Sequence, residues 1–369
     1  MWYTKLNDVS DPQRIAKKLL EIKKELRQSG VPVKDSQHML LATWNIREFD
    51  STKGGERGYE ALYYIAEIIS HFDIIAIQEI RGDLVAFKKV VRLLGNEWDY
   101  IASDETAGVQ GNGERMVFLY DTRKVSFTGI AGEIVLPPVK EKTNGGERVY
   151  NPIRQLYRTP YLCGFRSGWV KFFLTTVHIR YGKDDPNDPE RVREIFELAK
   201  FLKKRSKVRA ANNDDQKYYH FFLLGDFNIY SPQDATMQAL TSNGFMVPEE
   251  LEVLPHTNVG KKKRHYDQIA FIPKKRKLEF TKKAGVFDFF KTVYRDAEEQ
   301  MYVEQMDSLP KATYSRKSNG NQRTAKEKER FYKTYWRTHQ MSDHFPMWVQ
   351  IKTNFEEEFL TDFGEIDDQ

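Results

Sequence analysis

Short apolar runs of strand length alternate along this chain with turns and with stretches of helical amphipathic spacing. Such runs favour β-strands, whereas apolar residues three or four positions apart favour helices. We predict strands over residues 38–46, 73–80, 115–121, 161–166, 168–178, 219–226, 267–272 and 347–352. We predict helices over residues 11–28, 59–71, 83–95, 189–206 and 234–243. Many strands with interspersed helices indicate a layered α/β protein with mixed or antiparallel sheets.

Two pairs of neighbouring runs are close enough in the sequence to predict antiparallel hairpins. One would join residues 115–121 to residues 125–135. The other would join residues 161–166 to residues 168–178 through a turn that contains Gly168.

The composition supports a folded core and excludes several classes of protein. Of the 369 residues, 40% are hydrophobic and 13% aromatic, which excludes wholesale disorder. The single cysteine, Cys163, can neither close an internal disulfide nor build a cysteine-rich zinc site. The N-terminus does not resemble a signal peptide, and no stretch approaches about 18 uncharged apolar residues. We therefore expect no membrane span and a cytoplasmic protein.

Positive charge is concentrated in one segment. The formal net charge is +5, but residues 1–260 sum to about +1, residues 261–340 to about +11 and residues 341–369 to about −7. A basic segment of this kind is either a solvated surface or a patch that follows the phosphates of a nucleic acid. Aromatic residues near its end could stack on bases or pack inside the protein: Phe331, Tyr332, Tyr335 and Trp336.

Amide, acidic and histidine residues stand at the ends of the predicted strands. These positions are Asn45, Glu79, His178, Asp226, Asn228, Asp267, Asp343 and His344. A single carboxylate after a strand is usually a turn former or a helix cap. The ends of strands in a layered sheet converge in space, however. A cluster of such side chains supplies oxygen ligands for a hard divalent cation and histidines that titrate near neutral pH.

Short motifs in a fixed order resemble those of the endonuclease/exonuclease/phosphatase superfamily. They are WN at 44–45, QE at 78–79, His178, GDFN at 225–228, YDQI at 266–269 and SDH at 342–344. The resemblance covers roughly residues 38–353. It implies a four-layered α/β (α+β) sandwich, in which two mixed β-sheets are flanked by helices.

Finer features resemble the deoxyribonuclease-I-like branch of this superfamily. Glu114 directly precedes an apolar strand, and Arg158 stands two residues before Pro160. Asn112 occupies a position where this branch usually has a tyrosine. Asn112 is therefore a candidate substrate-binding residue, but it lacks the ring that contacts the sugar-phosphate chain in that branch.

The resemblance also implies the organisation of the chain. Residues 1–37 would form an N-terminal helical appendage, and residues 38–353 the catalytic domain. A basic insertion at about 274–340 would interrupt this domain, because the gap between two of the motifs is long. Residues 354–369 would form an acidic tail.

The activity implied is metal-dependent hydrolysis of a phosphodiester. Asn45 and Glu79 would hold Mg²⁺ or Mn²⁺, and Asp343 would assist, directly or through water. Ca²⁺ would be an additional structural ion. Asp226 would orient or deprotonate the attacking water, and Asn228 would bind a phosphate oxygen.

Two histidine–carboxylate pairs are implied in the same way. His344 would contact the scissile phosphate while Asp267 fixes its tautomer and favours its charged form. His178 would pair with Glu114, and Arg158 would donate a charge-assisted fork to the phosphate.

Three functions remain open on the sequence alone. The first is an endonuclease that acts on DNA through the basic segment 261–340, with RNA as an alternative or additional substrate. The second is a phosphoesterase for inositol phosphates, phospholipids or other small phosphoesters, since the same catalytic set serves such substrates. The third is a non-catalytic nucleic-acid-binding module, which is disfavoured because every core catalytic position is filled.

Overall fold

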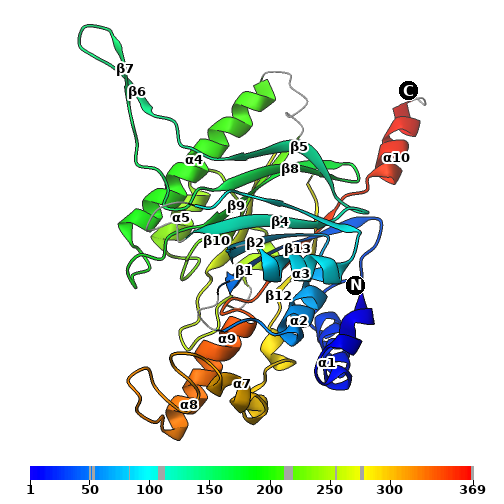
Figure 1. The fold of residues 1–369 in the computed structure, drawn as a ribbon. Coiled ribbons are helices and arrows are strands. Elements are labelled where there is room, and N and C mark those ends of the chain that lie inside the picture. Colours follow the sequence, from blue (N-terminus) through cyan, green and yellow to red (C-terminus); the bar gives the residue numbers. More distant parts are fainter. Residues whose placement is uncertain are drawn as a thin grey trace.

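Two mixed β-sheets stack face to face, and helices cover their outer faces (Figure 1). The computed structural model describes residues 1–49, 51, 55–82, 84–106, 113–211, 219–253, 256–274 and 278–366. The predicted fold, a four-layered sandwich with mixed sheets, is confirmed.

Within the described residues, the first sheet has six strands in the order β12-β13-β1-β2-β4-β3. They are β1 (His38–Phe49), β2 (Ile74–Arg81), β3 (Trp98–Ala102), β4 (Glu114–Asp121), β12 (Phe280–Val286) and β13 (Met347–Lys352). β1 pairs in parallel with β2 and antiparallel with β13. The first and last of these strands along the chain are therefore neighbours inside the sheet.

The second sheet has five strands in the described residues, in the order β11-β10-β9-β8-β5. They are β5 (Ser126–Glu133), β8 (Tyr161–Ser167), β9 (Val170–His178), β10 (His220–Asp226) and β11 (Asp267–Ile272). β10 pairs in parallel with β9 and antiparallel with β11. A separate two-stranded sheet, β6 (Val139–Lys142) with β7 (Arg148–Asn151), projects away from the body (Figure 1).

One predicted hairpin is confirmed and the other is wrong. β8 and β9 pair antiparallel as expected. The strands predicted over 115–121 and 125–135 belong to different sheets, because β4 pairs with β2 and β3 whereas β5 pairs with β8. The chain changes sheets after Asp121, whose carboxylate accepts a hydrogen bond of 2.7 Å from Arg123 Nη2 in the connecting turn.

The helices that the structure describes include every one predicted, with small shifts at their ends. They are α1 (Pro12–Gln28), α2 (Tyr59–Ser70), α3 (Val85–Leu94), α4 (Pro189–Ala211), α5 (Ala235–Thr241), α6 (Glu249–Glu252), α7 (Val303–Asp307), α8 (Ala325–Phe331), α9 (Arg337–Gln340) and α10 (Glu356–Ile366). Short 3-10 or π turns are η1 (Tyr3–Asp8), η3 (Phe289–Lys291), η4 (Asp296–Tyr302) and η5 (Tyr332–Trp336). In α1 the cap is Asp11, which accepts from the main-chain nitrogen of Arg14, and Pro12 occupies the first helical position.

The side chains of β1 alternate between two hydrophobic cores. Met39 and Leu41 lie in the core between the sheets, while Leu40 and Trp44 lie in the core beneath α1 and α2. A strand that is buried on both faces needs a nearly continuous apolar run. The polar residue Asn45 near its end is therefore an exception that needs another explanation.

The described part of residues 274–340 packs against the N-terminal helices. Its buried aromatic side chains contact one another in a cluster of Tyr294, Tyr302, Tyr332 and Trp336. The Tyr302 hydroxyl donates a 2.8 Å hydrogen bond to Glu60 of α2, which also pairs with Arg14 of α1. Of the two expectations for the aromatic residues of this segment, packing holds for Phe331, Tyr332 and Trp336, since all three are buried.

The end of the chain returns to the second sheet. Phe359 of α10 contacts the ring of Trp169, with the centroids 5.4 Å apart, next to the β8–β9 turn. Among the helices of the described residues, none combines the length and the apolar character that a membrane span requires.

Candidate active site

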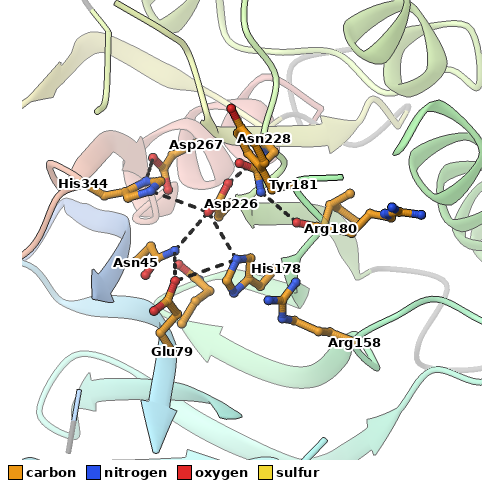
Figure 2. Close-up of polar contacts among 12 residues, drawn as sticks. Asn45, Glu79, Arg158, His178, Arg180, Tyr181, Asp226, Asn228, Asp267 and His344 are labelled. Atoms are coloured by element: carbon orange, nitrogen blue, oxygen red, sulfur yellow. Dashed lines mark hydrogen bonds and ion pairs between the residues drawn. The ribbon is translucent and has the colours of Figure 1, made fainter. Parts of the chain in front are cut away.

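The ends of strands from both sheets bring the predicted polar residues together (Figure 2). Within the second sheet, Asp226 at the end of β10 lies opposite His178 of β9 and Asp267 of β11. The first sheet contributes Asn45 from β1 and Glu79 from β2. The convergence follows from the topology, because parallel neighbours end at the same edge of a sheet.

Asp226 is the centre of the cluster. Its Oδ2 accepts a 3.0 Å hydrogen bond from Asn45 Nδ2. The same oxygen lies 3.5 Å from His178 Nε2 and 3.7 Å from His344 Nε2. The carboxyl is buried, and burial raises its pKa despite the two histidines nearby. One oxygen of Asp226 therefore lies within 3.0–3.7 Å of all three side chains.

His344 is held from several directions. Its Nδ1 lies 2.8 Å from Asp267 Oδ2, and its main-chain carbonyl accepts a 2.8 Å hydrogen bond from Trp44 Nε1. Burial opposes the charged form, but the carboxylates of Asp267 and Asp226 outweigh burial and hold the pKa of His344 well above its usual value. The charged form of the imidazole is therefore favoured.

His178 has the opposite protonation preference. Its Nδ1 lies 2.7 Å from Glu114 Oε1, and the Arg158 guanidinium contacts the same carboxylate. Burial, together with the positive charge of Arg158, lowers the pKa of His178 to about 4. Burial also raises the pKa of Glu114 to about 7, against the attraction of Arg158. The surroundings therefore favour the neutral form of His178 and the charged form of His344.

Two predicted substrate-binding residues, Arg158 and Asn228, contact other groups of the protein. Arg158 pairs with the buried Glu114. Asn228 donates from Nδ2 to the carbonyl of Ile179 at 2.8 Å, and its main-chain nitrogen donates to Asp226 Oδ1 at 2.9 Å. The backbone of Asn228 is left-handed, with φ of 53°. The predicted Asn112 lies outside the described residues.

The donor set fits a hard divalent cation. Asn45 Oδ1 is buried and has no hydrogen-bond partner among the described residues, although Asn45 Nδ2 lies 3.1 Å from Glu79 Oε1. Ligand atoms of Asp226, Asp267 and His344 also lie within 4.8 Å of one another. Carboxylates gathered in a buried site repel one another unless a cation or proton compensates. A cation could therefore be held by either group of residues.

The remaining predicted ligand, Asp343, lies on the wall of a neighbouring cavity of about 330 Å³. Its carboxylate is 3.7 Å from Arg47 Nε. The cavity is lined by Arg47, Glu48, Glu79, Arg81, Tyr335, His339 and Asp343. Sequence reasoning missed the two arginines, although each stands two residues after a predicted ligand on a strand and hence on the same face. It also missed His339, which no strand-end pattern marks.

Part of the basic segment is neutralised by a single carboxylate near the site. Lys262 Nζ and Arg264 Nη2 lie 2.9 and 2.5 Å from Asp184. The Arg264 guanidinium also lies 3.5 Å from the centroid of the Tyr230 ring, and its Nη1 donates to the Tyr266 hydroxyl at 3.0 Å. Lys262 and Arg264 are therefore engaged in contacts within the protein, in addition to any contribution that they make to the positive surface charge.

Comparisons with known proteins agree on the fold. D. rerio TDP2, solved with a single-strand DNA product, superposes with a TM-score of 0.52 at 14% identity over 86% of this chain and 100% of that chain. A functionally unknown conserved protein from Enterococcus faecalis V583 gives 0.51 at 16% identity over 86% of this chain and 100% of that one.

Sequence comparison is more specific. Bovine (Bos taurus) Deoxyribonuclease-1 is 36% identical over 91 residues, which are 23% of this chain and 31% of that protein. The chain thus matches about a third of the length of this relative. The sequence model of the Endonuclease/Exonuclease/phosphatase family matches residues 42–247, more than half of the chain. Together with the shared fold, this match shows that the chain belongs to the Endonuclease/Exonuclease/phosphatase family.

Proposed function

We propose that this protein is a divalent-metal-dependent phosphodiesterase that cleaves DNA internally. The observation that carries the proposal is the convergence of two histidine–carboxylate pairs on Asp226. His178 Nε2 and His344 Nε2 approach the same carboxylate oxygen, at 3.5 and 3.7 Å, from different sides (Figure 2). Such a geometry can orient a water molecule and move a proton on each side of one phosphorus centre.

Asn45 and Glu79 would hold Mg²⁺ or Mn²⁺, with Asp343 assisting from the adjoining cavity. When bound, such an ion neutralises charge on the phosphodiester and on the leaving oxygen. The unpartnered Oδ1 of Asn45 and the 3.1 Å separation of Asn45 Nδ2 from Glu79 Oε1 support this assignment. Rotation of the Asn45 amide would turn its oxygen toward Glu79.

The chain's own groups would divide the proton transfers. Asp226 would orient and deprotonate the attacking water, a role that suits a buried carboxylate with a raised pKa. The charged His344 would bind a phosphate oxygen, held by Asp267 at 2.8 Å. The neutral His178 would accept or relay a proton, oriented by Glu114 and Arg158. Asn228 would lie beside the phosphate.

DNA is the favoured substrate for two reasons. The sequence is 36% identical over 91 residues to bovine Deoxyribonuclease-1, an enzyme named for its action on DNA. Residues 261–340 also carry a net charge of about +11, which suits a polyanion.

A plasmid-nicking assay tests the proposal. Supercoiled DNA is incubated with the protein and Mg²⁺ or Mn²⁺, with and without a chelator. We expect nicking that the chelator abolishes and that His344→Asn and Asp226→Asn reduce at least a thousandfold. The matched control is His38→Gln, a histidine outside the site whose ring contacts Asp35. Turnover of an inositol phosphate without nicking would overturn DNA as the substrate.

A further inference from the structure

The segment that connects β5 to β8 is much longer than this connection requires, and it contains a two-stranded arm formed by β6 and β7. Glu133 at the end of β5 and Tyr161 at the start of β8 are direct partners in the second sheet. A turn of two residues can join strands that end opposite each other. Residues 134–160 make this connection instead. Ile134, Leu136 and Leu156 pack into the core, and β6 and β7 between them project away from the body (Figure 1).

No buried core explains this arm. All eight residues of its two strands are exposed. Among the described residues, neither strand pairs with any strand outside the arm. A two-stranded sheet of this kind is only marginally stable in water. An exposed arm without a core of its own is expected where the arm binds a partner outside the chain.

The two faces of the arm differ in chemistry. Lys140 lies opposite Tyr150, and Lys142 lies opposite Arg148, so these four side chains share one face. Lys140 Nζ lies 6.0 Å from the centroid of the Tyr150 ring, as expected for neighbours on that face. We call these four residues the basic face of the arm.

The other face carries no net positive charge. Its residues are Val139, Glu141, Val149 and Asn151. Asn151 Nδ2 donates to Glu141 Oε2 at 2.7 Å, which confirms that these two side chains share this face. Three cations with one aromatic ring on the basic face match the way proteins contact phosphates and stack on nucleic-acid rings.

Positive groups connect the arm with the active site. The chain leaves β7 and passes Arg154, whose guanidinium lies 5.1 Å from the centroid of the Tyr157 ring and also pairs with Glu190. Arg180 lies 4.3 Å from the same ring and donates to the Tyr157 hydroxyl at 2.9 Å. Arg180 and Arg158 both lie on the His178 side of the site, away from His344 (Figure 2).

We infer that the basic face of the arm binds the phosphates of duplex DNA outside the segment that occupies the active site. A two-stranded ribbon of four residues per strand is about 13 Å long and fits the major groove or the flanking backbones of a duplex. This inference rests on the proposed DNA phosphodiesterase function. The arm would lower the dissociation constant for long duplexes without taking part in the chemical step.

The test compares two arm variants of the full-length protein. The first is K140Q/K142Q/R148Q, which removes the cations of the basic face. The control is V139T/V149T, which changes the opposite face and leaves the charge of the arm unchanged. All substituted side chains are exposed, so both variants should keep the wild-type melting temperature.

Fluorescence anisotropy with a 30-base-pair duplex in a chelator measures binding without cleavage. We expect the basic-face variant to bind about tenfold more weakly than wild type at 100 mM salt. The slope of log Kd against log salt should fall by about 2 to 3, because each lost phosphate contact removes about 0.9. The control should match wild type in both quantities.

Cleavage is then measured separately. The basic-face variant should show a raised KM for long duplex and an unchanged kcat on bis-p-nitrophenyl phosphate. An unchanged Kd and salt slope would overturn the arm's role, even in a protein that nicks DNA. An equal loss in the control would also overturn it. Binding that depends on the arm in a protein without nuclease activity would overturn the proposed function and leave the arm as a DNA contact.

Discussion

The phenol ring of Tyr266 lies against the imidazole of His344, with the ring centroids 5.5 Å apart and the planes inclined by 29°. The next residue, Asp267, contacts the edge of the same imidazole at 2.8 Å. Two consecutive residues therefore fix both the face and the edge of His344. The Tyr266 hydroxyl is in turn anchored by Arg264.

Tyr266→Ala should lower kcat about tenfold, because the imidazole loses the ring that limits its tilt. Tyr266→Phe keeps this ring and loses only the hydroxyl, with its contacts to Arg264 and Tyr181, so it should retain most of the activity. Single-turnover nicking rates at saturating protein measure the difference. Equal rates for the two variants would show that the ring contact has no part in positioning His344.

Asp267→Asn should move the basic limb of the pH–rate profile to lower pH. In the native protein the attraction of Asp267 and Asp226 overcomes burial and raises the pKa of His344, so the charged form persists as the pH rises. The variant keeps the burial and loses the main attraction, and the pKa of His344 therefore falls. kcat/KM between about pH 5 and 9 should show a larger loss at the alkaline end. A uniform loss at all pH values would contradict this explanation.

Glu79→Gln removes a carboxylate from the proposed metal site and should weaken Mg²⁺ binding. The Mg²⁺ concentration for half-maximal activity should therefore rise by about 10- to 100-fold. Its exposed control, Glu97→Gln, should leave the titration unchanged. Mg²⁺ should also raise the melting temperature of the wild-type protein, because an ion that binds the folded state and not the unfolded chain stabilises the fold. A melting temperature that does not change on addition of Mg²⁺ would count against a metal at the proposed site.

Trp336→Ala should destabilise the protein by about 3 to 5 kcal/mol, since it removes a buried ring from the cluster with Tyr294, Tyr302 and Tyr332. Leu20→Ala on the solvent face of α1 is the control and should cost little, because Leu20 is 66% exposed. Urea unfolding followed by tryptophan fluorescence and circular dichroism gives both values. Similar midpoints for the two variants would show that the segment around Trp336 folds independently of the core.

The strand ends of the site could be predicted from the sequence because local pattern decides them. An apolar run that stops at Asn45, Glu79, His178 or Asp226 marks both a strand and its polar end. β8 and β9 were predictable as a hairpin for the same reason, since a turn with Gly168 separates two apolar runs.

Other features depend on packing between distant segments, which local pattern does not encode. The run after Asp121 predicts a strand but not the sheet that it joins, so its pairing was wrong. β12 was missed because Lys282 and Lys283 interrupt its apolar pattern on a partly exposed edge strand. Tyr335 and His339 reach the cavity beside Glu79 only because the segment that carries them packs against β1.

The pairing of β1 with β13 also sets when the site can form during synthesis. Asn45 lies in β1, whereas His344 comes much later in the sequence, just before β13. A ribosome that adds roughly 5–20 residues per second needs about 15–60 s to travel from one strand to the other. A nascent chain would therefore carry no complete cluster until both segments have left the ribosome.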